Sequence, residues 1–401
     1  MSLPRTAARL PDELVIEIFS SSVLSRKDLY RCSLVARRFV TSVNAFLYEI
    51  VRLDVWRTYT EVDSALGETE ERIEYSKNGF KLIRTLVENP KLADLVERVY
   101  LDEDVLEATD HRSLDTTQHQ VLSNLLRLAP NVKSISFSDS WIYDRGILGI
   151  INRHKNATEL EMEYTEDTEE DLQFIAQKMP QIKFLGVKDL TPDHNPPNLS
   201  IDFPSTLETI SLRVGNRALQ LALVKTNFSI LQSLTAPLHV ALELDFSLIP
   251  VLKQLYIQPS HDSATGQTTN RDWRIKDKAS KFWSSICASP ALQVLCLRGG
   301  PHYKEGYEAA LFDQSYIMSS GGPKKSIQTL RTIRFEDEID FNRVNCLLTS
   351  PLGSTIHRVV IPSRFVSPGA EPWDVNKYEF VSSLCQKLGI EVVLAERREG
   401  L

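Results

Sequence analysis

The sequence has few cysteines, and it has no long apolar run. No uninterrupted apolar stretch approaches the ~18 residues that a membrane-spanning helix needs, and the first 25 residues contain no apolar signal-peptide segment. We therefore expect an intracellular protein, in the cytoplasm or the nucleus. The five cysteines are odd in number and widely spaced, so we expect reduced thiols and no metal site.

The sequence also lacks the short motifs of common catalytic sites. It has no G-x-S-x-G, G-x-x-x-x-G-K-[ST], H-E-x-x-H or C-x-x-C segment, and no G-x-G-x-x-G after an expected strand. His111 and His119 have no cysteine nearby, and the acidic runs lack the glycine spacing of a calcium-binding loop. We therefore expect no enzyme, no cofactor and no metal ion.

The opening 50 residues are the most informative stretch. Residues 10–13 read Leu-Pro-Asp-Glu, which is typical of a helix start, because proline suits the first turn and carboxylates favour its positive end. Leu14, Ile18 and Phe19 then form one apolar stripe. Residues 25–28 have the spacing of a capping box, with aspartate in place of glutamate, and two more short helices are expected behind them.

About 45 residues cannot enclose all the large apolar side chains in this segment, so part of its surface is expected to meet a partner. Residues 1–52 carry eight Lys/Arg and five Asp/Glu, a net +3, whereas the whole chain carries −7, which leaves −10 for the remainder. A basic docking module favours an acidic partner, and an acidic body argues against nucleic acid as the main ligand.

Residues 10–48 resemble the F-box family. The matching segments are L-P-x-E-L at 10–14, I-F at 18–19, D-L at 28–29 and S-L-V-x-R-R-F at 33–39. Ala36 stands where the family usually has cysteine and Phe39 where tryptophan is common, and both remain apolar. The alternative to an F-box is that these helices are an ordinary N-terminal cap on the domain that follows them. The resemblance implies that the following residues bind the small acidic adaptor of an SCF ubiquitin ligase, and through it a cullin: Leu10, Pro11, Leu14, Ile18, Leu34, Val35 and Phe39.

The rest of the chain alternates between short apolar strands and helices. After the F-box at 1–52, mixed spacings of three and four over 60–94 predict a helical linker, which we place at 53–94. From residue 95 an apolar-x-x-apolar-x-apolar pattern recurs, and its central copies are 21 to 25 residues apart. The middle positions of the ten copies are Val99, Ile135, Leu160, Leu185, Ile210, Leu234, Leu255, Leu295, Ile333 and Val359.

This period resembles the leucine-rich repeats of F-box proteins of the fungal type. The expected fold class is therefore α/β, with a three-helix F-box followed by an irregular leucine-rich-repeat solenoid of about ten strand-helix units over 95–401. A doubly wound α/β domain is the alternative. Helices are expected at 120–128, 144–151, 171–179 and 375–388, and a last strand at 390–394. Insertions are expected at 258–290 and 298–327, and they either form a ligand-binding rim or are surface loops without a binding role.

Together these features predict a substrate-recognition subunit that holds the adaptor through the F-box and a protein substrate through the repeats. The alternatives are a scaffold outside the ligase and an α/β enzyme with a helical extension. The side chains next to the apolar strand positions are expected on the open concave face of the sheet, because side chains alternate along a strand. These side chains are mainly acidic in the early copies of the repeat and mainly basic in the later ones. The predicted substrate-binding residues are Arg213, Tyr256, Arg298 and Arg334, whose charges either bind an acidic or phosphorylated segment or only keep the surface soluble.

Overall fold

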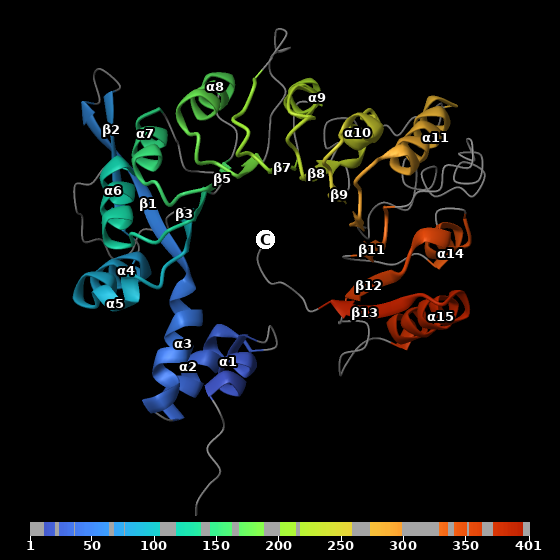
Figure 1. Cartoon of the computed structure of the whole chain (residues 1–401). Coiled ribbons are helices and arrows are strands. Elements are labelled where there is room, and N and C mark those ends of the chain that lie inside the picture. Colours follow the sequence, from blue (N-terminus) through green and yellow to red (C-terminus); the bar gives the residue numbers. More distant parts are fainter. Residues whose placement is uncertain are drawn as a thin grey trace, which may run out of the picture. The chain divides into compact units, whose positions relative to one another are not determined.

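The computed structural model of the chain describes residues 12–20, 24–35, 37–63, 68–75, 77–104, 118–137, 145–162, 168–187, 201–213, 217–258, 273–298, 329–335, 341–350, 353–362 and 372–395. These residues fall into two compact units, one up to Thr158 and one from Glu159. Each unit combines helices with a mainly parallel sheet (Figure 1).

The first unit opens with three helices, as the sequence predicts. They are α1 (Asp12–Ser20), α2 (Arg26–Val35) and α3 (Arg37–Glu49). Phe19, Leu29 and Val43, one from each helix, form their buried core, and the rings of Phe19 and Phe39 meet edge to face with centroids 5.5 Å apart. The apolar stripe read at Leu14, Ile18 and Phe19 therefore reaches this core through Phe19.

A β-hairpin follows α3 directly, and the prediction of helix over 60–94 is wrong for the residues that lie in this hairpin. β1 (Ile50–Asp63) pairs antiparallel with β2 (Glu68–Tyr75), and a helix begins only at α4 (Lys77–Glu88). β1 is rich in valine, threonine and aromatic residues that favour strands, and it pairs with a strand on each side. The helical linker expected at 53–94 is therefore helical only in its later part, and its domain limits stay a prediction.

The remaining elements of the first unit alternate between helix and strand. They are α5 (Pro90–Ala93), β3 (Arg98–Asp104), α6 (Gln118–Leu128), β4 (Ser134–Phe137) and α7 (Arg145–Arg153). The strands lie in the order β2, β1, β3, β4, and all neighbours except the hairpin are parallel. Because β1 pairs with β3 from Ile50 onward, the three opening helices lead into the sheet without an intervening segment.

The described residues of the second unit form nine parallel strands in chain order. They are β5 (Glu159–Met162), β6 (Phe184–Val187), β7 (Thr209–Leu212), β8 (Ser233–Pro237), β9 (Gln254–Gln258), β10 (Val294–Leu297), β11 (Thr332–Phe335), β12 (Arg358–Pro362) and β13 (Glu391–Ala395). The segments between them include α8 (Thr168–Lys178), α9 (Arg217–Thr226), α10 (Leu238–Ala241), η1 (Phe246–Leu248), α11 (Trp273–Ala288), α14 (Phe341–Thr349), η2 (Gly353–Thr355) and α15 (Pro372–Leu388).

The ten apolar positions read from the sequence all lie on strands, so this prediction is confirmed. In the first unit Val99 is the register partner of Ile135. In the second unit the remaining eight positions follow one another in register from Leu160 on β5 to Val359 on β12. Each of the ten side chains is at most 1% exposed, because each strand turns the same apolar position toward the helices.

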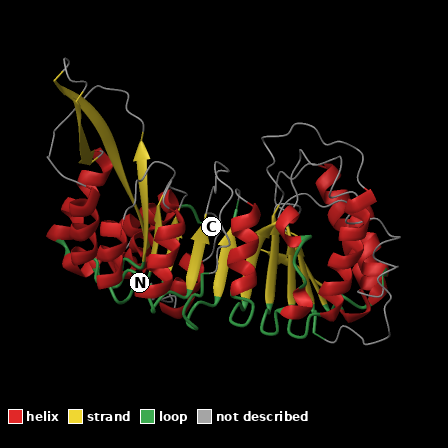
Figure 2. Cartoon of the chain, turned by 90° about the horizontal axis from the view of Figure 1, so that it is seen from above, coloured by secondary structure: helices red, strands yellow, loops and turns green. Residues whose placement is uncertain are grey.

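The helices of the second unit lie together on one side of its strands (Figures 1 and 2). The core between the two layers includes Phe246, Phe282 and Trp283, whose rings pack edge to face at centroid distances of 5.8 and 5.1 Å. None of the described helices lies on the opposite side of this sheet, which we call the helix-free face (Figure 1). Side chains alternate along a strand, so the neighbours of the buried middle positions point to that face.

The turns that lead into the strands are tied to one another by side chains. Asn131 Nδ2 donates to the Asp94 carbonyl and Asn156 Nδ2 to the Pro130 carbonyl, each at 2.8 Å. In the second unit, Thr206 Oγ1 donates to the Pro180 carbonyl at 2.6 Å. These bonds join successive helix-to-strand turns and hold their carbonyls in fixed positions.

The end of the second unit agrees with the sequence. α15 and β13 form where a helix at 375–388 and a strand at 390–394 are expected. Gly389 closes α15 at φ 71°, with Ile390 N donating to the Cys385 carbonyl at 2.8 Å, which is the Schellman arrangement. Of the two predicted insertions, the first contains α11, and residues 259–272 and 299–328 lie outside the described residues. None of the described helices is both long and apolar enough to cross a membrane.

Candidate functional surfaces

The three opening helices leave many of their apolar side chains in solvent. Leu14 and Ile18 on α1 are about half exposed, and Leu34 and Val35 on the last turn of α2 are 69% and 77% exposed. These side chains are only partly buried by the described residues, and several of them on neighbouring helices are typical of a surface that meets a partner.

Three of the predicted docking residues are not among these four. Leu10 and Pro11 lie outside the described residues. Phe39 is partly buried and packs against the Phe19–Leu29–Val43 core, so it supports the exposed residues from beneath.

Sequence reasoning missed three exposed apolar side chains in this region, Ile16, Tyr30 and Val40. Tyr30 stands four residues before Leu34 on α2, and that spacing places both on one helix face. This spacing was the signal that could have identified Tyr30. Ile16 is off the stripe of Leu14 and Ile18, and no periodic pattern marks it.

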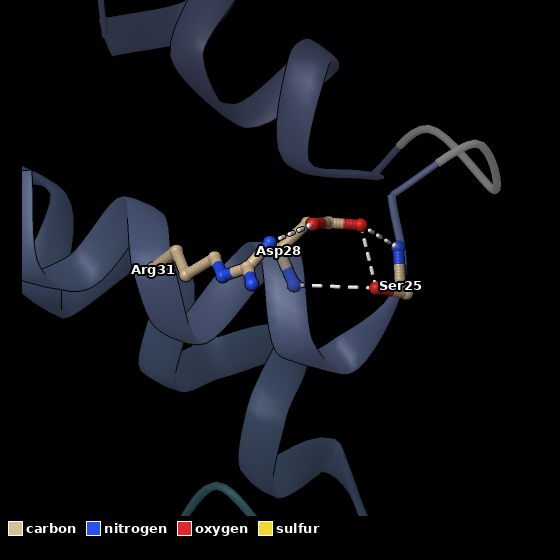
Figure 3. A network of polar contacts seen from close by, with 3 residues as sticks. All are labelled: Ser25, Asp28 and Arg31. Carbon is tan, nitrogen blue, oxygen red and sulfur yellow. Dashed lines mark hydrogen bonds and ion pairs between the residues drawn. The ribbon is translucent and has the colours of Figure 1, made fainter.

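A capping box fixes the start of α2 (Figure 3). The Asp28 amide donates to Ser25 Oγ at 3.2 Å, and the Asp28 carboxylate accepts from the Ser25 hydroxyl at 2.5 Å and the Ser25 amide at 3.3 Å. The side-chain bond from Ser25 is the main cause that lowers the pKa of Asp28, with help from the Ser25 amide and the charges of Arg31 and Lys27. The predicted box is confirmed, and it gives α2 a defined first residue.

Arg26 ties α2 to the junction between α3 and β1. Its guanidinium donates to the Ile50 carbonyl, and the Glu97 amide donates to the Glu49 carbonyl at 2.9 Å. Both bonds fall where the helices pass into the sheet. The Arg26 bond thus ties the first turn of α2 to β1, and the Glu97 bond ties the end of α3 to the residue before β3.

The helix-free face of the second unit carries the other predicted site residues. Tyr256 on β9 and Arg334 on β11 are half-buried, and Cys296 on β10 is the register partner of both. Arg298 is exposed one residue after β10, where its amide continues the pairing by donating to the Ile257 carbonyl at 2.9 Å. The structure therefore brings Tyr256, Arg298 and Arg334 to neighbouring positions around Cys296.

Arg213 is separate from this group. Its guanidinium forms an ion pair at 3.1 Å with Glu161 on β5, two strands away from β7, after which Arg213 follows directly. Gly186 on β6 is the register partner of Glu161 and of Ser211, and a Cβ there would come within 2.8 Å of Glu161 Cγ. The missing side chain of Gly186 makes room for the Glu161 side chain to cross β6.

Within the described ranges, no group of three or more His, Cys, Asp or Glu side chains could hold a metal ion. Cys385 is buried, and burial raises the pKa of its thiol to about 11, so the thiolate is scarce at neutral pH.

Comparison with known proteins identifies the opening region. Residues 7–58 match the family model described as F-box-like, a range that contains α1, α2, α3 and the first part of β1. Among curated proteins, none matches the chain closely enough to count as a relative.

Proposed function

We propose that this protein is the substrate-recognition subunit of an SCF-type ubiquitin ligase. The observation that carries the proposal is the F-box-like match over 7–58, because within it Leu34 and Val35 are strongly exposed apolar side chains. F-box domains bind the small acidic adaptor of SCF complexes. The proposed adaptor-binding residues are Leu10, Pro11, Leu14, Ile18, Leu34, Val35 and Phe39, to which Ile16 and Tyr30 are added.

Electrostatics support an acidic partner for this surface. Arg26, Lys27 and Arg31 are exposed on the first turns of α2, and only Asp28 faces them from the same turns. Complementary charge speeds encounter and fixes orientation, and the exposed apolar side chains supply the affinity.

For the rest of the chain we propose a leucine-rich-repeat solenoid, the repeat type predicted from the sequence. Its support is the one short strand per unit, with the same buried apolar position in register from strand to strand. A doubly wound sheet would reverse its strand order and carry helices on both faces. The strands of the second unit instead follow chain order, with their helices on one side (Figure 1).

The proposed mechanism is proximity and involves no chemistry on this chain. A substrate held by the repeats and an adaptor held by the F-box would bring substrate lysines close to a charged conjugating enzyme, which raises their effective concentration. The cullin would enter through the adaptor. On the substrate side we propose Arg213, Tyr256, Arg298 and Arg334 on the helix-free face.

The test is capture of the adaptor by the full chain and by two matched double variants. Leu34→Ser with Val35→Ser removes two exposed aliphatic side chains from α2. Leu248→Ser with Val251→Ser removes two exposed aliphatic side chains from the second unit and serves as the control. Hot-spot truncations cost ~2 kcal/mol or more each, so the first variant should bind over about a hundredfold more weakly, and the control should bind like the wild type.

Capture of the adaptor together with a cullin from cell lysate supports the ligase proposal. Capture of the adaptor without a cullin favours a scaffold outside the ligase. Wild-type adaptor binding by the α2 variant, with its circular dichroism unchanged, would contradict the docking assignment.

A further inference from the structure

The last strand of the second unit differs from the strands before it. β13 pairs with β12, and among the described residues it has no strand on its other side. Val392 and Leu394 on β13 are the register partners of Val359 and Ile361, which are fully buried toward the helices. Leu394 is nevertheless 39% exposed, and Val392 is only half-buried. β13 therefore has the apolar residues of an inner strand at positions that are partly in solvent.

The helix that packs on β13 also leaves apolar side chains in solvent. Leu384 on α15 is half-buried, and Leu388, one turn later, is 44% exposed. This spacing places both on one helix face. The terminal units of repeat solenoids are usually capped by a polar surface, whereas this unit leaves apolar side chains of both its helix and its strand in solvent.

The open edge of β13 also presents backbone groups. The Glu391 amide donates to the His357 carbonyl at 2.9 Å, so Glu391 directs its backbone toward β12. In a parallel ladder this direction alternates from residue to residue. Val393 therefore points to β12 as well, whereas Val392 and Leu394 direct their N–H and C=O groups to the open edge. Two donors and two acceptors are thus in place for a further strand.

These residues are complementary to a second copy of the same strand. If two β13 strands pair antiparallel about Val393, then Val392 of each lies opposite Leu394 of the other, and each such pair exchanges two N–H···O bonds. Val393 meets its own copy on the helix-free face, so the three central pairs are all apolar. Glu391 is the one charged residue of β13, and it comes opposite Ala395, so like charges do not meet.

From this edge we infer that the chain forms a symmetric dimer through antiparallel pairing of β13 with β13 of a second copy. The two-fold axis uses the same edge on both copies, so the assembly closes at two chains. The joined sheet keeps the helices of both copies on one side. The inference goes beyond the proposed function and does not depend on adaptor binding.

The edge strand of the first unit has a different composition. Among the described residues β2 also pairs on one side only, with β1. Four of its eight residues are glutamates, and charge on an edge strand opposes pairing with another chain. Glu391 on β13 is instead held by Arg358 of its own chain at 2.8 Å. The composition therefore favours pairing at β13 over pairing at β2.

The experiment is sedimentation velocity on the full chain between about 1 and 100 µM. A short strand and a few apolar side chains make a small interface, so we expect a monomer–dimer equilibrium in the micromolar range. A single monomeric species at every concentration would overturn the inference. Species larger than a dimer would contradict the closed two-fold arrangement.

Two matched variants locate the interface. Val393→Lys brings two ammonium groups together across the two-fold axis, and it should raise the dimer dissociation constant at least about tenfold. Val360→Lys is the control, because Val360 is the half-buried register partner of Val393 on β12. Its two copies are three strand spacings, about 14 Å, apart, which exceeds the Debye length at about 0.1 M salt. The control should stay within about twofold of the wild type, and equal weakening by both variants would overturn the site.

A mixing experiment tests the register. Val393→Glu should weaken the dimer as Val393→Lys does, but an equimolar mixture of the two variants should dimerise, because opposite charges then meet. Recovery in the mixture also shows that both variants are folded. Failure to recover, with circular dichroism like that of the wild type, would overturn the pairing of Val393 with its copy.

Hydrogen exchange of the unmodified chain locates the interface without any substitution. The amides of β13 should exchange more slowly at about 100 µM than at about 1 µM, whereas those of β9 should not change. Equal exchange of β13 at both concentrations, in a chain that dimerises, would place the dimer interface elsewhere and overturn the inference.

Discussion

The three opening helices and the strands of the second unit use apolar residues in opposite ways. Among the described side chains of α1 to α3, Phe19, Leu29 and Val43 are buried, whereas seven large apolar side chains are strongly exposed: Leu14, Ile16, Ile18, Tyr30, Leu34, Val35 and Val40. On β5 to β12 the two core-facing residues of each strand are at most 7% exposed. The strands bury their core-facing residues within the chain, whereas the described helices leave much of their apolar surface in solvent.

Size explains the difference. Three short helices enclose too little volume to bury all their apolar groups, but each added strand-helix unit of the second region buries its apolar positions against the unit before it. Apolar residues on the strands therefore contribute to stability, and we propose that the exposed ones on the helices contribute to binding.

The largest expected effect is in the sheet. Leu295→Ala removes a fully buried side chain from β10 and should lower the free energy of unfolding by ~2–5 kcal/mol in urea or guanidinium titrations. Val294→Ala, on the same strand but on the helix-free face, is the matched control and should cost much less. Equal losses at the two positions would break the comparison, because both faces would then be equally important for packing.

The second effect distinguishes core from surface within the helices. Val43→Ala should destabilise α1 to α3 by about 2 kcal/mol, since Val43 is fully buried in a small core. The control Val40→Ala removes the same atoms at an exposed position three residues earlier. Amide hydrogen exchange should show faster exchange of α1 to α3 in the first variant only, with β5 to β12 unchanged. Faster exchange throughout the chain would mean that the helices and the sheet unfold together.

The third prediction concerns the crossing of Glu161 over β6. Gly186→Ala places a Cβ 2.8 Å from Glu161 Cγ, so the glutamate must move and its bond to Arg213 should break, at ~1–3 kcal/mol. Glu161→Ala should relieve the overlap, so the double variant should lose less than the two single losses together. Additive losses in a double-mutant cycle would show that Gly186 and Glu161 act independently.

The smallest effects are in the response to acid, at two residues of the first unit, His154 and Asp28. His154, at a turn before β5, is partly buried, and this burial lowers its pKa below the ordinary 6.5 despite its bond to the Val132 carbonyl. The unfolded chain then takes up the proton first, so stability should decline as pH falls through 6.5 toward the lower folded value. His154→Asn should make the denaturation midpoint less dependent on pH over this window. An unchanged dependence on pH would exclude the histidine as the cause of the decline.

Asp28 behaves differently because its pKa is lowered by hydrogen bonds and neighbouring charges. Its contribution to α2 is present above the ordinary value of 3.8 and is lost as pH falls through the folded pKa. Ser25→Ala removes the main cause of the shift and about 1 kcal/mol of capping, so the acid-induced loss of helicity at α2 should begin at higher pH. Carboxyl titration of Asp28 by NMR measures this directly, and an unshifted titration would contradict the role of Ser25.

Local patterns in the sequence determined much of the architecture. Residues 25–28 predicted the capping box, and the recurring apolar position from Val99 to Val359 predicted ten strands, because both signals depend only on neighbours in the chain. The F-box resemblance read at 10–48 agrees with the F-box-like match over 7–58.

Only the tertiary structure decided features that depend on partners far along the chain. β1 is a strand because β2 and β3 pair with it, and its own mixed spacing did not show this. Phe39 is turned to the core, and Arg213 is held by Glu161 across Gly186, because packing and room for a side chain are set by neighbouring elements. Sequence period specifies which face a residue occupies, but only the assembled sheet specifies which side chain it meets.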